Sequence, residues 1–458
     1  MPRIVIIGAG LSGLATAFRI RRAMPDADLN VLDAGSRAGG NIGTRTENGF
    51  TYELGPNGFL DNKPGTLQLC RDLGIDSQLI AASEASRVNR FLCLDGKLVK
   101  LPGSPRGLLG TKALTWKGKL SLMREPWRKR PADVAEDETV AAFATRRFGK
   151  ETAEKVIDAL VTGIHGGDPT QLSAAAAFPR LVKFEAEAGS VLRGVLRASK
   201  AKKAAALAKG EPKPGPPRMW SFPQGLQVLV DALVKDLGGA LKLNRRVTKL
   251  ETTGGKWVVR GEGHASWLAD AVVLTTPAET QANLLGNLSA DIVAELRAIP
   301  YNRIAVVALG YKRFEVTHSL DGFGYIAPQN TRRDVLGVQW CSSIFPERAP
   351  AGSVLWRALC GGVHRGELLD LDDATLIAKV HAEMQAVMGV TGEPVFARVV
   401  KWPRAIPQYV VGHLARVRRI EAMATAIPGL VLGGNAFHGI AMNDVCEQAE
   451  RIASALTV

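Results

Sequence analysis

Cysteine is scarce in this 458-residue sequence, and its five cysteines lie far apart without a C-x-x-C pair. Such spacing argues against a disulfide framework, a zinc site and a dithiol redox centre. No apolar run approaches the roughly 18 residues that a membrane-spanning helix needs, and the run at 4–7 is too short for the core of a signal peptide. We therefore expect a chain that suits the reducing cytosol, with neither a spanning segment nor a secretory leader.

Other chemistry is missing as well. The seven histidines show no metal-binding spacing such as H-x-x-x-H, and no G-x-S-x-G motif is present. These absences predict no resident metal and no serine hydrolase. Apolar residues make up 46 % and charged residues 22 % of the chain, an ordinary globular composition for two or three domains.

Acidic residues are outnumbered in one region. The net charge is +14, and residues 97–131 hold ten basic residues and one acid. Residues 180–218 hold ten more basic residues and three acids, so the rest of the chain is close to neutral. The middle of the chain is therefore expected to face something anionic. We expect no nucleic-acid partner.

The N-terminus predicts a strand at 3–7, a glycine turn at 8–13 (GAGLSG), a helix, and a second strand at 29–33. In a G-x-G-x-x-G turn, Gly8 permits the tight bend, Gly10 lets the backbone approach a pyrophosphate, and Gly13 lets the helix pack closely. The helix N-terminus then offers free N–H donors to the phosphates. Asp33 ends the second strand, where a carboxylate accepts a ribose hydroxyl and disfavours NADP.

Periodicity predicts the remaining elements only coarsely. Helices are expected at 153–164, ending at 237, at 372–388 and at 442–456. Strands are expected at 241–247, 257–260, 271–275 and 430–432, and an antiparallel sheet between 304 and 362. Residues 200–217, basic and then rich in proline and glycine, are expected to form a surface loop.

Three further motifs distinguish FAD from NAD as the dinucleotide. They are 37–44 (RAGGNIGT), 53–59 (ELGPNGF) and 433–444 (GGNAFHGIAMND). In this order they resemble the fingerprints of the flavin amine oxidase superfamily, and the resemblance implies FAD. It assigns the following residues to the cofactor: Gly8, Ala9, Gly10, Leu11, Ser12, Gly13, Asp33, Ala34, Arg37, Gly39, Gly40, Asn41, Gly55, Pro56, Asn57, Gly58, Val247, Trp402, Gly434, Asn435, Ile440, Ala441 and Met442.

Within that superfamily the chain resembles the oxygen-dependent protoporphyrinogen oxidases nearly end to end. The marks are 89–92 (NRFL), 163–169 (GIHGGDP), 322–326 (GFGYI), 342–346 (SSIFP) and 402–409 (WPRAIPQY) with GH at 412–413. The resemblance implies a six-electron oxidation of protoporphyrinogen IX to protoporphyrin IX, with three O2 reduced to H2O2. The flavin does the chemistry, and no side-chain base is implied.

The resemblance also assigns the substrate contacts. Arg90 would pair with a propionate, the Gly163 carbonyl would hold the pyrrole N–H groups, and Phe323, Ile326 and Leu359 would sandwich the tetrapyrrole. Ordinary alternatives stand beside each role: a basic surface residue, a turn glycine and plain core. Trp402 could likewise be core rather than a neighbour of the flavin. Asp33 stands where the family more often has glutamate.

The expected fold is α/β: a Rossmann-like FAD-binding domain from 1–85, 218–275 and 396–458, with an inserted mixed-sheet substrate domain at 276–395. A basic helical region at 86–217 is expected to dock on an anionic membrane surface, which places the protein in the cytoplasm at the inner face of the cell membrane. A homodimer and a ferrochelatase that takes the product are the candidate protein partners.

Three other functions stay open from the sequence. One is a coproporphyrinogen III oxidase, whose four-propionate substrate needs more cations. The second is another flavin oxidase or desaturase, although with only five tyrosines no aromatic cage is evident near 433–444. The third is a flavin-less escort protein on the same scaffold, against which the intact glycine motifs argue.

Overall fold

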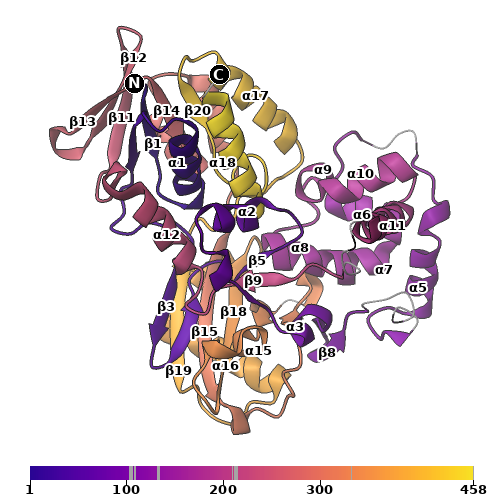
Figure 1. The fold of residues 1–458 in the computed structure, drawn as a ribbon. Helices are drawn as coiled ribbons and strands as arrows, with labels where there is room; N and C mark the ends of the chain where they lie inside the picture. The colour runs from indigo at the N-terminus through magenta and orange to yellow at the C-terminus, as the bar shows by residue number, and fades with distance from the viewer. Residues whose placement is uncertain are drawn as a thin grey trace.

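The computed structural model describes residues 1–102, 107, 110–131, 135–208, 210, 215–331 and 333–456. Figure 1 shows a parallel-sheet unit that carries both ends of the chain, a second unit built on a seven-stranded sheet, and a helical unit to one side. Among the described residues, no helix is both long and apolar enough to cross a membrane. The predicted α/β class is confirmed.

Five parallel strands form the first sheet. Across the sheet they run β10 (Leu241–Lys242), β2 (Asp28–Leu32), β1 (Arg3–Ile7), β14 (Ala271–Leu274) and β20 (Leu430–Leu432). Because side chains alternate along a strand, Ile4 and Ile6 enter one core while Val5 and Ile7 enter another. The sheet is therefore covered on both faces, as expected of a Rossmann-like unit.

Helices and a small sheet cover these two faces. The Ile4 side packs against α1 (Leu11–Ala23), α2 (Gly65–Asp72), α12 (Gln227–Leu237) and α18 (Met442–Leu456). The Val5 side packs against α13 (Ala278–Leu284), α14 (Ala290–Arg297), α17 (His413–Thr425) and the antiparallel strands β11 (Val247–Thr253), β12 (Lys256–Gly261) and β13 (Ser266–Ala269).

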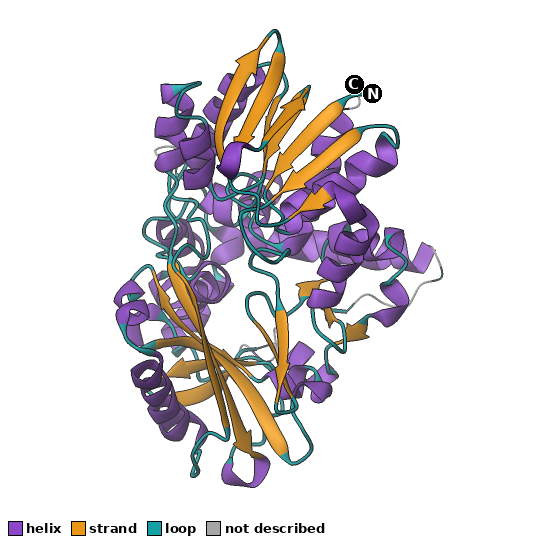
Figure 2. Cartoon of the chain, turned by 90° about the vertical axis from the view of Figure 1, so that its left-hand side faces the viewer, coloured by secondary structure: helices purple, strands orange, loops and turns teal. Residues whose placement is uncertain are grey.

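The second unit is a mixed sheet of seven strands (Figure 2). Its order is β19 (Phe396–Trp402), β15 (Arg303–Lys312), β18 (Ser353–Gly362), β17 (Val335–Gln339), β16 (Gly324–Ile326), β7 (Phe91–Leu94) and β8 (Lys97–Lys100). Every neighbouring pair is antiparallel except β16 and β7. Helix α16 (Asp373–Met388) packs on one face, against Trp356, Ala358 and Cys360. Arg357 and Leu359 therefore lie on the opposite face.

Short elements connect the units. They are the hairpin β3 (Thr44–Glu47) and β4 (Phe50–Glu53), the small sheet β5 (Phe59–Leu60), β9 (Met219–Ser221) and β6 (Ile80–Ala81), and the helices α3 (Glu84–Val88) and α15 (Cys341–Ile344).

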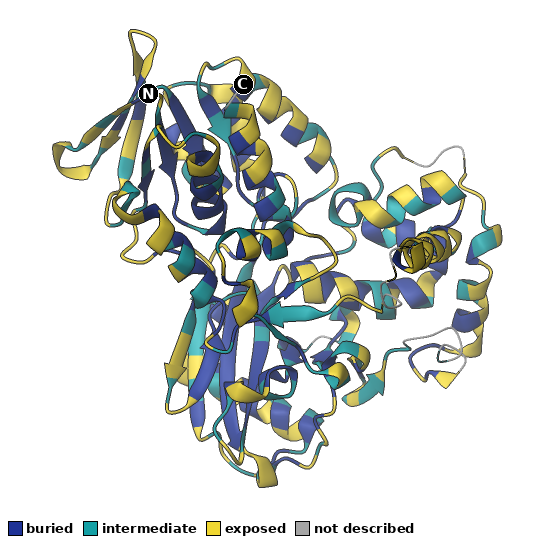
Figure 3. Ribbon diagram, in the orientation of Figure 1, coloured by how far each residue is buried: buried dark blue, intermediate teal, exposed yellow. Residues whose placement is uncertain are grey.

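The helical unit contains much of the two basic stretches at 97–131 and 180–218. Its helices are α5 (Trp116–Met123), α6 (Val140–Phe148), α7 (Lys150–Thr152), α8 (Asp158–His165), α9 (Ala174–Ala177), α10 (Pro179–Ala188) and α11 (Val191–Ala208), with a π-helical turn at Ala153–Ile157. Figure 3 shows that α11 is exposed along most of its length.

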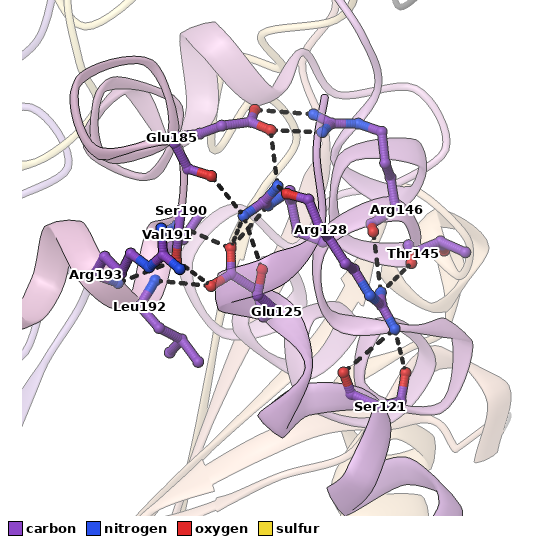
Figure 4. A network of polar contacts seen from close by, with 12 residues as sticks. Ser121, Glu125, Arg128, Thr145, Arg146, Glu185, Ser190, Val191, Leu192 and Arg193 are labelled. Atoms are coloured by element: carbon purple, nitrogen blue, oxygen red, sulfur yellow. Dashed lines mark hydrogen bonds and ion pairs between the residues drawn. The ribbon is translucent and has the colours of Figure 1, made fainter. Parts of the chain in front are cut away.

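A buried ion pair organises this unit (Figure 4). The side chains of Glu125 and Arg147 are both fully buried, and Arg147 Nε donates to Glu125 Oε1 at 2.8 Å. The same carboxylate accepts the Val191 N–H at 2.9 Å and the Leu192 N–H at 3.2 Å, so it caps the N-terminus of α11. One carboxylate thus fixes the start of the long basic helix.

The structure corrects two sequence predictions. The strand expected at 241–247 is interrupted at Asn244, whose φ of +53° turns the chain, so β10 and β11 join different sheets. Residues 200–208 continue α11 instead of forming a loop, because this alanine-rich stretch favours helix; residues 209 and 211–214 lie outside the described residues. Strands β7, β8 and β19 pair into the seven-stranded sheet.

Candidate active site

The first glycine turn brings α1 close to β1. Gly8 has φ +110°, and a Cβ on Gly13 would lie 1.8 Å from the Gly8 carbonyl oxygen, so only glycine fits there. Gly10 precedes α1 and provides no side-chain cap, which leaves the first N–H groups of the helix for a ligand. Leu11 and Ser12 are buried in the first turn of α1.

Asp33 faces this turn, as the sequence predicts. Its Oδ2 accepts the Ala9 N–H at 2.6 Å and its Oδ1 accepts the Gly35 N–H at 2.7 Å. The Asp33 carbonyl accepts the Arg245 N–H at 2.8 Å, which places Val247 two residues beyond this contact, while Ala34 is exposed. The carboxylate is thus held by backbone donors beside the pyrophosphate turn.

The 37–41 loop packs on the same turn. Gly39 N–H donates to the Ala9 carbonyl at 2.7 Å, and a Cβ on Gly40 would lie 3.1 Å from the Gly10 Cα. The Arg37 guanidinium donates to carbonyl oxygens of its own loop, including that of Ile42 at 2.8 Å. Burial lowers the pKa of Arg37, and Asn41 remains exposed. Arg37 therefore shapes the loop that meets the cofactor motif.

The C-terminal motif meets the N-terminal turn through Thr275. The Thr275 hydroxyl donates to the Gly8 carbonyl at 3.1 Å, and a Cβ on Gly434 would lie 3.3 Å from the Thr275 carbonyl. Gly434 N–H donates to Gln448 Oε1 of α18 at 2.7 Å. Ile440 and Ala441 then lead into α18, whose first residue Met442 is buried. The structure thus brings the two ends of the chain together.

The segment 54–58 lies where the two sheets meet. Trp402 Nε1 donates to the Leu54 carbonyl at 2.7 Å, and Arg357 donates to the Gly55 carbonyl. A Cβ on Gly55 would lie 2.0 Å from the Asn41 carbonyl, which joins this segment to the 37–41 loop. Asn57 is buried with its side-chain N–H2 unpartnered among the described residues, while Pro56 and Gly58 are half-buried.

Three of the five residues assigned to the substrate, Gly163, Ile326 and Leu359, meet at the α16-distal face of the seven-stranded sheet. Ile326 pairs with Gly337 and Gly337 with Leu359 across three neighbouring strands, and a Cβ on Gly337 would lie only 2.7 Å from the Tyr325 carbonyl oxygen. A Cβ on Gly163 of α8 would lie 2.5 Å from Ile326 Cδ1. Leu359 also packs with Trp402 in one apolar cluster.

Arg90 stands at the edge of this face. Its guanidinium carbon lies 4.9 Å from the centre of the Phe323 ring, and no described carboxylate forms an ion pair with it. Solvent reaches the side chain, yet the surrounding protein displaces enough water to lower the pKa of the guanidinium. The arrangement is an apolar face with one free cation at its rim, which fits a flat apolar molecule carrying a carboxylate.

Three residues of the family motifs at 402–409 and 412–413 make contacts that the sequence analysis did not assign to them. Tyr409 donates its hydroxyl to the Asn435 carbonyl at 2.6 Å and accepts the Gly439 N–H at 2.9 Å, which ties down the C-terminal motif. Its ring stacks on His413 with centroids 4.0 Å apart. The preceding residue, Gln408, donates to the His165 carbonyl at 3.0 Å, at the end of α8. These hydrogen bonds span 26, 30 and 243 residues, so only the fold reveals them.

Residues 11–457 match the flavin-containing amine oxidoreductases, and the chain belongs to this family. It is an FAD-dependent oxidoreductase with an α/β fold.

Among curated proteins, protoporphyrinogen oxidase 1, chloroplastic, of Arabidopsis thaliana is 32 % identical over 98 % of this chain and 87 % of that protein. The coproporphyrinogen III oxidase of Bacillus subtilis is 29 % identical over 99 % of this chain and 98 % of that protein. The resemblance to the protoporphyrinogen oxidases is thereby confirmed.

Solved structures agree on the fold. A candidate protoporphyrinogen oxidase of Exiguobacterium sp. 255-15 superposes with a TM-score of 0.84 at 25 % identity, covering 100 % of this chain and 98 % of its own. The cyclohexylamine oxidase of Brevibacterium oxydans IH-35A gives a TM-score of 0.70 at 15 % identity, covering 100 % and 98 %. The second match shows the fold alone.

Proposed function

We propose that this flavoenzyme oxidises protoporphyrinogen IX to protoporphyrin IX, with O2 as the electron acceptor. The observation that carries the proposal is the apolar face at Ile326, Gly337 and Leu359 with the free cation Arg90 at its rim. A tetrapyrrole is broad and apolar and bears propionates on one side, so it matches both features. The relatives named protoporphyrinogen oxidase support the same assignment.

The protein residues bind and orient in this proposal. Ile326 and Leu359 exclude water from the rings, Arg90 holds a propionate, and the Gly163 carbonyl accepts pyrrole N–H groups. The glycine motifs hold FAD, which supplies a two-electron acceptor when bound. No side-chain base is required, because the pyrrole N–H groups of the substrate release the protons.

Coproporphyrinogen III is the second candidate substrate, because relatives with that activity in their names match the chain over nearly their whole length. Its four carboxylates would need more cations than the single arginine that the described residues show at this rim. Arg90 is the only cation among the residues assigned to the substrate. Protoporphyrinogen, with two propionates, is therefore the preferred substrate in this proposal.

Aerobic turnover of the two porphyrinogens tests the proposal. Porphyrin fluorescence and peroxide are followed together, with Arg90→Ala beside the control Arg87→Ala, whose guanidinium already pairs with Glu84 at 3.1 Å. A charge-assisted contact contributes about 1.5–3 kcal/mol, so Arg90→Ala should lower kcat/KM by roughly 10- to 100-fold. Faster turnover of coproporphyrinogen than of protoporphyrinogen would overturn the substrate assignment. Equal kinetics of Arg90→Ala and Arg87→Ala would overturn the role of Arg90.

We further propose that the helical unit docks on an anionic membrane surface. Trp116 and Trp127 flank α5 with 70 % and 74 % of their surface exposed, and Leu196 and Leu207 of α11 are 66 % and 81 % exposed. Basic residues of α11, such as Arg193 and Arg197, accompany these apolar side chains. Anionic lipid attracts each surface cation by about 1 kcal/mol, and exposed tryptophans insert at the interface.

Vesicle sedimentation tests the docking. Binding to vesicles that contain anionic lipid should fall with added salt, and Trp116→Ser with Trp127→Ser should weaken it further. The exposed Phe314→Ser, on the sheet unit, is the matched control because that residue is 84 % exposed far along the chain from these helices. Binding of equal strength to neutral vesicles at high salt would contradict the proposal.

The three-domain division, the homodimer and the ferrochelatase partner remain predictions.

A further inference from the structure

A buried arginine lies on the substrate side of the seven-stranded sheet without a carboxylate of its own. Arg357 is 1 % exposed on β18, between Leu355 and Leu359 on the same face. It donates to the Gly55 carbonyl and, at 3.2 Å, to Gln339 Oε1, while its Nε has no partner among the described residues. Both of its contacts are neutral groups, so neither balances the guanidinium charge.

The surrounding titratable groups leave this charge unbalanced. Glu53, 1 % exposed, pairs with a second buried arginine, Arg348, at 3.2 Å, and also accepts the Leu226 N–H at 2.9 Å. Burial raises the pKa of Glu53 and lowers that of Arg357. The nearby Cys341 thiol, whose pKa burial raises to about 11, is neutral at pH 7. Two guanidinium groups therefore share one carboxylate.

An isolated buried charge is strongly unfavourable, and protein interiors keep one only where an opposite charge offsets it. The Gly55 segment that Arg357 contacts joins the 37–41 loop on one side and Trp402 on the other. The adenine end of FAD belongs over the first sheet, at Asp33, and the substrate face belongs to the second sheet. The redox ring must bridge the two, next to this segment.

We propose that Arg357 is the buried counter-charge for the reduced cofactor ring. The ring takes two electrons and one proton from the substrate as a hydride, and so gains one negative charge, while a second substrate proton leaves to solvent. The guanidinium field favours that charge and raises the reduction potential of the bound flavin. The placement of the ring rests on the proposed site, whereas FAD itself follows from the family.

The potential of the bound flavin is measured against a reference dye in the purified holoenzyme. Arg357→Met should shift the ratio of reduced to oxidised flavin about 30-fold toward the oxidised form, as expected for one charge roughly 8 Å away at an effective dielectric constant of about 20. Arg357→Lys keeps the charge but not the fork geometry and should restore most of the ratio. Glu53→Gln removes the shared negative charge and should shift the ratio the other way. Arg333→Met is the control, because Arg333 pairs with Glu383 near α16.

Each outcome decides the proposal. Equal shifts in Arg357→Met and Arg357→Lys would assign Arg357 a purely structural role, and an unchanged potential in the methionine variant would also overturn the inference. If Arg357→Met loses FAD or fails to fold, the Arg357→Lys and Glu53→Gln variants decide. A flavin potential in Glu53→Gln that is no higher than in the wild type would refute the proposal. A wild-type protein that binds no FAD would instead overturn the active site itself, which keeps the two failures distinguishable.

Discussion

Removal of a single hydroxyl, that of Tyr409, should weaken FAD binding while the rest of the fold stays intact. This hydroxyl makes two hydrogen bonds, to the Asn435 carbonyl at 2.6 Å and from the Gly439 N–H at 2.9 Å. Each is worth roughly 1 kcal/mol net. Tyr409→Phe therefore removes about 2 kcal/mol of restraint on the loop that leads into α18, and if FAD must re-order that loop its Kd rises about 30-fold.

Titration of apo-protein with FAD, followed by quenching of flavin fluorescence, measures this effect. Tyr311→Phe is the matched control, because that buried tyrosine also stacks on a histidine and bonds to it, Tyr311 Oη to His381 Nδ1 at 3.0 Å. It belongs to the α16-side core, away from the glycine motifs. Both variants should lose thermal stability, and only Tyr409→Phe should lose FAD affinity. Equal FAD affinity of the two variants would refute the reasoning.

Three other perturbations have defined outcomes. Gly13→Ala should abolish FAD binding, because its Cβ would meet the Gly8 carbonyl at 1.8 Å; the flavin absorbance of the purified protein measures it. Glu125→Gln should destabilise the helical unit by about 3 kcal/mol, because it leaves the buried Arg147 with only the 3.4 Å contact to Glu185, and limited proteolysis of that unit reports it. Burial lowers the pKa of His165 from 6.5 to about 4. Because only the unfolded state takes up the proton in this range, the free energy of unfolding should fall by roughly 3 kcal/mol as the pH drops from 6.5 to 4. Denaturation of the wild type and of His165→Gln at several pH values measures the difference.

Matched variants separate these effects from general damage. Gly286→Ala places its Cβ 3.5 Å from the nearest atom and should retain flavin. Glu187→Gln loses only an exposed pair with Lys183 and should leave proteolysis unchanged. The first prediction is contradicted if Gly13→Ala retains full flavin. The second is contradicted if Glu125→Gln is as resistant to proteolysis as the wild type. The third is contradicted if the difference in unfolding free energy between wild type and His165→Gln does not depend on pH.

Local patterns predicted the nucleotide-binding turn well, because the physics there is local. The strand at 3–7, the glycine turn and the following helix depend on near neighbours in sequence, and the structure confirms them as β1 and α1. The contact between Asp33 and this turn follows from the pairing of β1 with β2. The antiparallel sheet expected between 304 and 362 is confirmed by β15 and β18, whose alternation is clear over ten residues each.

Sheet membership and the buried polar contacts could not be predicted in the same way. The sequence of β19 contains no feature that predicts pairing with β15 rather than with the parallel sheet, because strands of either sheet are extended and apolar. Arg357 looks like an ordinary outward residue of a strand until the Gly55 segment, 302 positions earlier, is seen to cover it. Tyr409 belongs to the family motif at 402–409, but its role is not evident before the fold brings Asn435 to its hydroxyl. Contacts of this kind depend on tertiary packing alone.

The proposed active site combines residues from three units of the fold, so these units must be held in fixed positions relative to one another. The parallel-sheet unit holds the dinucleotide, the seven-stranded sheet presents the apolar face, and α8 of the helical unit closes over Ile326. Two adjacent residues meet that demand: Gln408 fixes the end of α8 through the His165 carbonyl, and Tyr409 fixes the cofactor loop through Asn435. In the proposed site these two adjacent residues therefore tie the end of α8, beside the substrate face, to the loop that carries the cofactor motif.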